Sequence, residues 1–254
     1  MRDIDWNVTA RMDRTYVKVY EEERELTVML VVDVSGSLDF GTRQRSQRQL
    51  LTEVAATLAF SAMGNNDKVG ALFVTDRVEL YIPPGKGRSH ILHIIRQLLV
   101  FEPQSRRTNL AAGLEFLTRV QRKRSIAFVL SDFVDSGLLH QRAEDPQPVP
   151  TEAGQRALSI AARKHDVVAV QVYDPVLEQL PRVGLLKVRD AETGHEQIID
   201  TLDERVRRRH SLHWLKQQQA LGELLVRHGV DHTTIATNGD YAKALTQLFG
   251  ARRR

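Results

Sequence analysis

The sequence predicts an α/β fold built around a doubly wound, mostly parallel sheet. Short apolar runs rich in β-branched residues recur along the chain, as expected of strands buried on both faces. Segments with helical apolar spacing separate these runs, and this alternation indicates βαβ units. The rhythm breaks at residues 180–200, where two short strand patterns flank a turn, so we expect a β-hairpin insertion there.

The elements follow one another in a regular order. The expected strands are Leu26–Val32, Val69–Val74, Val78–Ile82, Ile126–Leu130, Val167–Val172, Leu185–Val188, Glu196–Ile199 and Val230–Ala236. The expected helices are 43–63, Ser89–Val100, Asn109–Gln121, Gln155–His165, 203–228 and 241–249. Residues 141–150 contain three prolines and are expected to form a loop.

The first 25 residues differ in character from the rest. They are polar and charged, with one alternating stretch, Thr15–Tyr20, that predicts a short edge strand. We assign residues 1–25 to an N-terminal extension and residues 26–250 to the α/β domain. The longest apolar run, Leu26–Val32, is far below the ~18–20 residues that a membrane helix needs. Because Met1–Trp6 also lacks the apolar core of a signal peptide, we expect a cytoplasmic protein.

Composition excludes several kinds of site. The chain has no cysteine, which excludes disulfides, thiolate zinc sites and thiol nucleophiles. Lys and Arg (36) exceed Asp and Glu (32) by four, a balance too weak to indicate nucleic-acid binding. The basic clusters at 205–209 and 252–254 are interpreted as a solvated helix face and a chain end.

Oxygen-bearing side chains gather at the expected carboxyl ends of strands. Asp33, Ser35 and Ser37 follow the first buried strand, Thr108 precedes a helix, and Asp132 follows a later buried strand. Ligands of doubly wound sheets bind beyond the carboxyl ends of the strands, so these side chains are expected to converge. A ligand set of oxygen atoms, without His or Cys, suits Mg²⁺ or Mn²⁺ better than zinc.

Each of these residues also has a simpler interpretation. Thr108 is a good N-cap for the helix that starts at Asn109, so it has two candidate roles. Asp132 could be an ordinary turn residue, although metal ligation is favoured. Asp39 and Asp135 are near enough for the outer coordination shell, but solvated loop carboxylates are the favoured interpretation. The spaced histidine pairs, His90 with His93 and His210 with His213, are expected to be packed or exposed rather than ligating.

The order Asp-x-Ser-x-Ser, then a distant Thr, then a distant Asp resembles the metal-ion-dependent adhesion site of von Willebrand factor A domains. The matching residues are Asp33, Ser35, Ser37, Thr108 and Asp132. The resemblance implies a von Willebrand factor A-like fold and a bound divalent metal ion. It also implies that the metal takes a further carboxylate, from an Asp or Glu, supplied by a protein partner.

A second resemblance extends along nearly the whole chain. Segments Arg2–Trp6, Thr9–Arg11 and Val17–Glu25 resemble the bacterial family called domain of unknown function 58. Members of that family are usually encoded beside MoxR-type AAA+ ATPases, which makes such an ATPase the implied partner. Members normally begin well upstream of the Ile-Asp-Trp motif at residues 4–6, so this chain is expected to lack the usual N-terminal portion.

These observations favour a metal-ion-dependent protein–protein interaction module rather than an enzyme. The implied role is that of an adaptor or partner of a MoxR-type AAA+ ATPase, in a chaperone-like or assembly process. The alternative is a metal-dependent phosphohydrolase with Asp33 as nucleophile, but the sequence offers no nucleophile–base pair. Nucleic-acid binding is disfavoured because the chain has no recognition motif and only 6% aromatic residues.

Overall fold

A six-stranded sheet forms the centre of the protein, with strand order β10-β7-β4-β1-β2-β3. The computed structural model describes residues 11–12, 25–41, 45–134, 136–142, 145–189 and 194–252. The sheet strands are β1 (Thr27–Asp33), β2 (Lys68–Val74), β3 (Val78–Gly85), β4 (Ile126–Ser131), β7 (Asp166–Tyr173) and β10 (Asp231–Ala236). All neighbouring strands are parallel except β2 and β3. Counted within this sheet, the order is the 3-2-1-4-5-6 of doubly wound folds, which confirms the predicted fold class.

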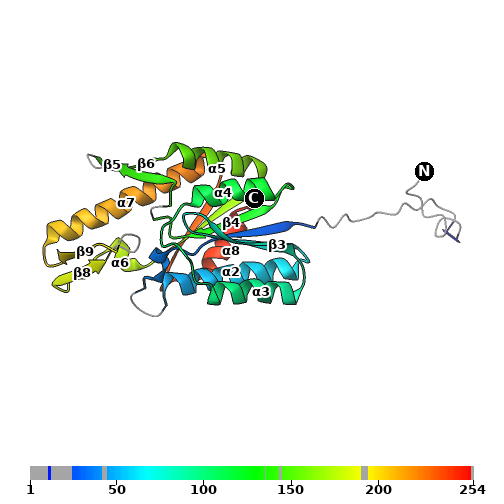
Figure 1. Ribbon diagram of the computed structural model, residues 1–254, viewed down its shortest axis with the longest axis horizontal. Coiled ribbons are helices and arrows are strands. Elements are labelled where there is room, and N and C mark those ends of the chain that lie inside the picture. Colours follow the sequence, from blue (N-terminus) through cyan, green and yellow to red (C-terminus); the bar gives the residue numbers. More distant parts are fainter. Residues whose placement is uncertain are drawn as a thin grey trace.

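Helices cover both faces of the sheet (Figure 1). One face packs against α2 (Gln47–Gly64), α3 (Arg88–Val100) and α8 (Tyr241–Arg252), and the other against α4 (Leu110–Val120), α5 (Glu152–Lys164) and α7 (Glu204–Arg227). Alternate residues of β1 enter opposite cores, with Leu30 on the α2 side and Met29 on the α4 side. This two-sided burial explains why the strand sequences are continuous apolar runs.

The helix that follows β1 begins later than expected. Ser46 accepts a hydrogen bond from the backbone N–H of Gln49, and the Gln49 side chain accepts one from the backbone N–H of Ser46. This capping box fixes the first turn of α2 at Gln47, four residues after the predicted start at residue 43. The helix ends at Gly64, just before Asn66 adopts a φ of 59°.

The expected loop at 141–150 is wrong. Strands β5 (Leu139–Arg142) and β6 (Asp145–Pro150) pair as an antiparallel hairpin outside the main sheet. Thr151 donates its backbone N–H to the carbonyl of Leu138, and backbone direction alternates along a strand, so the nitrogens at odd positions of β6 face the partner strand. The prolines stand at even positions, where the backbone nitrogen faces away from the partner strand and no N–H donor is needed. Alternate prolines are therefore compatible with a two-stranded ribbon, which the prediction from proline content did not allow for.

The predicted insertion at 180–200 is confirmed as a hairpin of β8 (Leu185–Arg189) and β9 (Glu196–Asp200). It follows the short helix α6 (Pro175–Glu178) and leads into α7. In Figure 1 the hairpin and the start of α7 extend away from the sheet. We call residues 183–216, as far as the structure describes them, the arm. The predicted strand Thr15–Tyr20 and most of the N-terminal extension lie outside the described residues.

None of the described helices is both long enough and apolar enough to cross a bilayer.

Candidate metal centre

The carboxyl ends of two neighbouring parallel strands bring the first candidate residues together. Asp33 is the last residue of β1 and Ser131 is the last residue of β4. The hydroxyl of Ser131 donates a hydrogen bond of 2.6 Å to Oδ2 of Asp33, across a sequence distance of 98 residues. The candidate site therefore lies where the rule for doubly wound sheets places it.

Asp33 is a buried carboxyl group. Only 1% of the residue is exposed, and its Oδ1 accepts a 2.8 Å hydrogen bond from the backbone N–H of Ser35. Burial raises the pKa of Asp33, while hydrogen bonds from Ser131 and Ser35 and the nearby charge of Arg48 act in the opposite direction. An ionised carboxylate at this position is thus disfavoured by desolvation, and a bound cation would relieve that penalty.

The two serines of the motif present their hydroxyl groups side by side. Ser35 Oγ and Ser37 Oγ are 3.1 Å apart, and Ser35 is fully buried. The short 3₁₀ helix η1 (Gly36–Asp39) begins after Ser35, whose side chain forms no capping hydrogen bond with it. The sharp turn after β1 therefore directs alternate oxygen atoms toward one region, as the motif predicts.

The structure corrects the expected N-cap role of Thr108. Helix α4 begins at Leu110, and Oδ1 of Asn109 accepts the capping hydrogen bond from the backbone N–H of Ala112 at 3.2 Å. Thr108 is only 7% exposed, and its Oγ1 has no hydrogen-bond partner among the described residues. A buried hydroxyl without a partner is costly, so this orphan oxygen is an observation in favour of a ligand.

Backbone contacts tie the segment before Thr108 to the serine loop. The N–H of Gly36 donates to the carbonyl of Arg106 at 3.1 Å. The same segment is held from the other side by Glu79, whose carboxylate oxygens accept hydrogen bonds from the backbone N–H groups of Gln104 and Ser105. These contacts bring Thr108 into the neighbourhood of Ser35 and Ser37.

Asp132 is also buried, with 2% of the residue exposed. Its Oδ1 accepts a 3.0 Å hydrogen bond from the backbone N–H of Val134, and its carbonyl accepts one from Gln171. The next residue, Phe133, has a φ of 59° and donates its N–H to Ser131 Oγ at 2.9 Å. A bulky residue in this region is unusual and shows that the turn after β4 is tightly constrained.

The two outer-shell candidates have different outcomes. The Asp39 side chain is 61% exposed, and its Oδ1 forms a 2.7 Å ion pair with Arg48. This supports the favoured interpretation of Asp39 as a surface carboxylate. Asp135 lies outside the described residues.

The donor set fits a hard cation better than zinc. Among the described residues, no group of three or more His, Cys, Asp or Glu side chains could hold a metal ion. A cation here would depend on two carboxylates together with the hydroxyls of Ser35, Ser37 and Thr108, a set that suits Mg²⁺. A carboxylate oxygen has more than one acceptor position, so the hydrogen bonds of Asp33 do not exhaust its capacity.

Most of the chain is similar to known proteins. It matches the family described as "Protein of unknown function DUF58" over residues 1–220. The chain belongs to the DUF58 family. Uncharacterized protein Rv1480 from Mycobacterium tuberculosis is 34% identical over 196 residues, which cover 76% of this chain and 57% of that relative. This DUF58 chain therefore spans little more than half the length of the mycobacterial protein.

A solved structure shares the fold of this DUF58 protein. The conserved hypothetical protein BatB from Bacteroides thetaiotaomicron aligns with 89% of this chain and 98% of its own, with a TM-score of 0.55 and 16% identity. A von Willebrand factor type A structure from Catenulispora acidiphila covers 92% of this chain and 42% of its own, with a TM-score of 0.47 and 10% identity.

Three histidines of this DUF58 protein contact backbone carbonyls or are buried. His90 Nε2 lies 2.8 Å from the carbonyl of Val69, and His210 Nε2 lies 2.8 Å from that of Leu177. His165 is 1% exposed, and burial lowers its pKa to about 4, with smaller contributions from the charges of Lys164 and Arg124.

Several residues that organise the site were not identified from the sequence. Ser131 bonds to Asp33, Glu79 holds the segment before Thr108, and Arg48 donates to the carbonyls of Val34 and Ser35 at 3.3 Å. Ser131 stands at a strand end next to Asp132, which is a signal that could have been used. The long-range partners of Glu79 and Arg48 have no comparable signal.

Proposed function

We propose that this DUF58 protein is a metal-ion-dependent protein–protein interaction module. Asp33, Ser35, Ser37, Thr108 and Asp132 would hold Mg²⁺, or Mn²⁺, at the carboxyl ends of β1 and β4. The observation that carries the proposal is the buried Thr108 hydroxyl, which has no hydrogen-bond partner among the described residues and lies in a segment bonded to the Ser35–Ser37 loop. Such an orphan oxygen supports a ligand at this position.

The ligand set supports docking of a carboxylate from a partner. When bound, the metal would supply a Lewis acid that accepts one more oxygen ligand. Neutral hydroxyl groups make up three of the five proposed protein ligands, so they leave more of the cation's charge available than carboxylates would. The site's geometry would be fixed before a partner's Asp or Glu binds, because three of its residues, Asp33, Ser35 and Asp132, are buried.

The proposed partner is a MoxR-type AAA+ ATPase, with this protein acting as its adaptor in a chaperone-like or assembly role. The resemblance of residues 2–25 to the family is what points to this partner. An acidic side chain on the ATPase, or on a client that the ATPase remodels, would complete the metal's coordination.

We further propose that the protein is not an enzyme. The phosphohydrolase alternative needs an acid or base group beside Asp33, yet the groups that donate hydrogen bonds to its carboxylate belong to two serines, Ser35 and Ser131. The guanidinium group of Arg48, a candidate for binding phosphate, contacts Asp39 and two backbone carbonyls. Turnover of a phosphate ester that is lost in Asp33→Asn would overturn this part of the proposal.

Binding to a MoxR-type AAA+ ATPase tests the proposal. We would immobilise the full chain and measure binding of that ATPase in Mg²⁺ and in EDTA, for the wild type, Asp33→Asn and the control Asp39→Asn. We expect binding in Mg²⁺ alone, its loss in Asp33→Asn and its retention in Asp39→Asn. Equal binding by Asp33→Asn, or binding that EDTA leaves unchanged, would refute the metal-dependent mechanism.

A further inference from the structure

The arm carries a surface that the fold itself does not need. Helix α7 has 24 residues, yet its buried residues, Leu221, Leu224 and Leu225, all lie near its carboxyl end. The amino-terminal part of α7 packs beside the β8–β9 hairpin and projects from the sheet (Figure 1). None of the buried apolar residues of either core lies in the arm.

A groove of about 780 Å³ runs between β9 and the amino-terminal part of α7. Aliphatic side chains line it while remaining open to solvent, with Ile198 71% and Leu212 49% exposed. Large apolar side chains that gather at one exposed, hollowed surface are typical of interaction sites.

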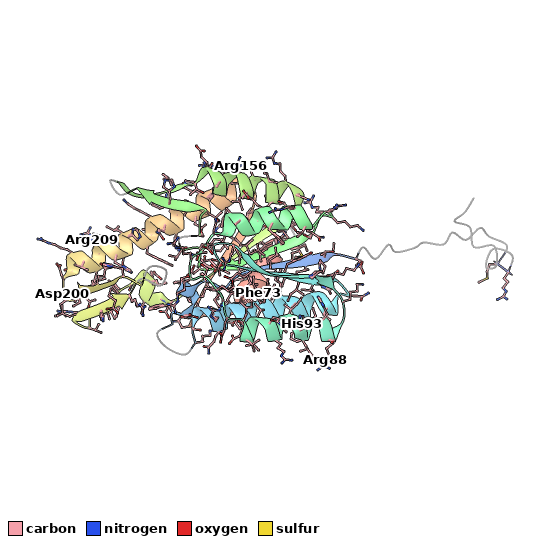
Figure 2. All side chains as sticks on the ribbon, viewed as in Figure 1. Phe73, Arg88, His93, Arg156, Asp200 and Arg209 are labelled. Atoms are coloured by element: carbon pink, nitrogen blue, oxygen red, sulfur yellow. The ribbon has the colours of Figure 1, made fainter. Side chains whose placement is uncertain are left out.

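The same groove carries a concentrated positive charge. Arg205, Arg208, Arg209 and Lys216 line it, against one acidic residue, Asp200. Figure 2 labels Arg209 on α7 and Asp200 at the end of β9, on the two sides of this part of the arm. No ion pair involving these four cations is found within the described ranges, so their charges are available to a partner.

The groove faces the same end of the molecule as the candidate metal centre. The arm begins after the carboxyl end of β7, and α7 runs back from there toward the start of β10. Asp33 and Ser131 stand at the carboxyl ends of β1 and β4, which are parallel to β7. A protein docked on this end of the sheet can reach both surfaces.

We propose that the groove between β9 and α7 binds an acidic protein segment that also carries aliphatic side chains. Aliphatic groups of the segment would cover Ile198 and Leu212, and its carboxylates would pair with Arg205, Arg208 and Arg209. This inference goes beyond the proposed function and does not require a metal ion.

Charge and side-chain chemistry favour this occupant over two others. A second copy of the chain that presents the same groove would bring like charges together, which opposes a twofold contact. A nucleic acid would find phosphate-binding cations, but none of the residues that line the groove is Phe, Tyr or Trp, so the large rings on which bases stack are absent from its lining. Exposed aliphatic groups between arginines match an acidic, partly apolar peptide better.

Selection from a phage-displayed library of random dodecapeptides tests the proposal. The bait is the full chain in EDTA, so that the metal centre does not contribute. We expect enriched peptides to be net acidic and to contain Leu, Ile or Val. Their binding should weaken at least tenfold in Arg208→Glu/Arg209→Glu and in Ile198→Ser, and should stay within twofold in the charge-matched control Arg88→Glu/Arg156→Glu. All these positions are exposed, so folding is expected to be retained.

Several outcomes would overturn the inference. These are peptides of basic or neutral composition, peptides that bind the groove variants as well as the wild type, or no enrichment at all. The inference also fails if an oligothymidylate or vesicles containing phosphatidylglycerol bind the groove in place of peptides, or if sedimentation shows a dimer that the groove variants disrupt. Asp33→Asn should leave peptide binding intact, so failure here and failure of the metal-dependent mechanism are distinguishable.

Discussion

Replacing Asp33 with Asn should make the metal-free protein more stable and the Mg²⁺-bound state unattainable. The carboxyl group is buried, and desolvation raises its pKa above the usual range. Without a cation, ionisation of this carboxyl group places a desolvated negative charge inside the fold. Asn has nearly the same shape and carries no charge, so the same hydrogen-bonding loop can form without that penalty.

The size of the effect follows from the contacts of Asp33. Burying an ion destabilises a fold by roughly several kcal/mol, and each hydrogen bond to the charged group offsets about 1.5–3 kcal/mol of this penalty. Asn retains an oxygen for the Ser35 N–H but not for the Ser131 hydroxyl, which donates to Oδ2 at 2.6 Å. We expect the variant to gain about 1–2 kcal/mol in free energy of unfolding, which is about 2–8 °C in Tm for a chain of this size.

Magnesium should reverse the order of stability. At a concentration 100 times its Kd, a ligand that binds the folded state alone adds about 2.7 kcal/mol. The wild type should gain this stabilisation, and Asp33→Asn should not. Thermal unfolding followed by circular dichroism at pH 8, in EDTA and then in MgCl₂, measures both effects, with Asp39→Asn as the control. A variant that is less stable than the wild type in EDTA, or that responds equally to Mg²⁺, would refute the reasoning.

Three further perturbations test other parts of the structure. Thr108→Val removes a buried hydroxyl without a described partner, so it should leave metal-free stability unchanged or raise it by about 1 kcal/mol while weakening Mg²⁺ binding, as measured by unfolding and by calorimetry. The pKa of His165 is lowered to about 4 in the folded state, so protonation of its imidazole favours the unfolded state. The free energy of unfolding should therefore fall by about 2–3 kcal/mol between pH 7 and pH 4.5. Urea unfolding of His165→Asn should not show this pH-dependent loss. Gly113→Ala places a Cβ 2.8 Å from a methyl group of Val74, so it should destabilise the protein by about 1–3 kcal/mol in urea unfolding. Gly64→Ala places a Cβ with nothing within 4 Å and should not destabilise it. Equal effects at the two glycines would contradict the packing of α4 on β2.

Much of the fold could be predicted because strand burial leaves a local signal. Four strands of the central sheet, β1, β2, β4 and β7, are buried almost throughout, so their sequences are apolar runs. The hairpin at β8–β9 was also predictable because a turn separates two short strands. The β5–β6 hairpin was not predicted because its prolines indicate a loop. Alternating prolines fit a strand when the register turns their nitrogens away from the partner strand, and composition does not show the register.

The candidate site was predictable only in part. The residue types and spacing of Asp33, Ser35 and Ser37 indicate a cation site before any coordinates are known. The role of Thr108 could not be separated from helix capping, because the decision depends on whether Thr108 or Asn109 occupies the cap position. The contact between Ser131 and Asp33 joins residues on different strands, which sequence spacing alone cannot reveal.

A calorimetric titration of Mg²⁺ into the metal-free protein tests the central claim most directly. The wild type and Asp33→Asn are measured under identical conditions, with Mn²⁺ as a second ion. The account predicts saturable binding at one site in the wild type and none in Asp33→Asn. Absence of binding in the wild type, or equal binding in both proteins, would contradict it.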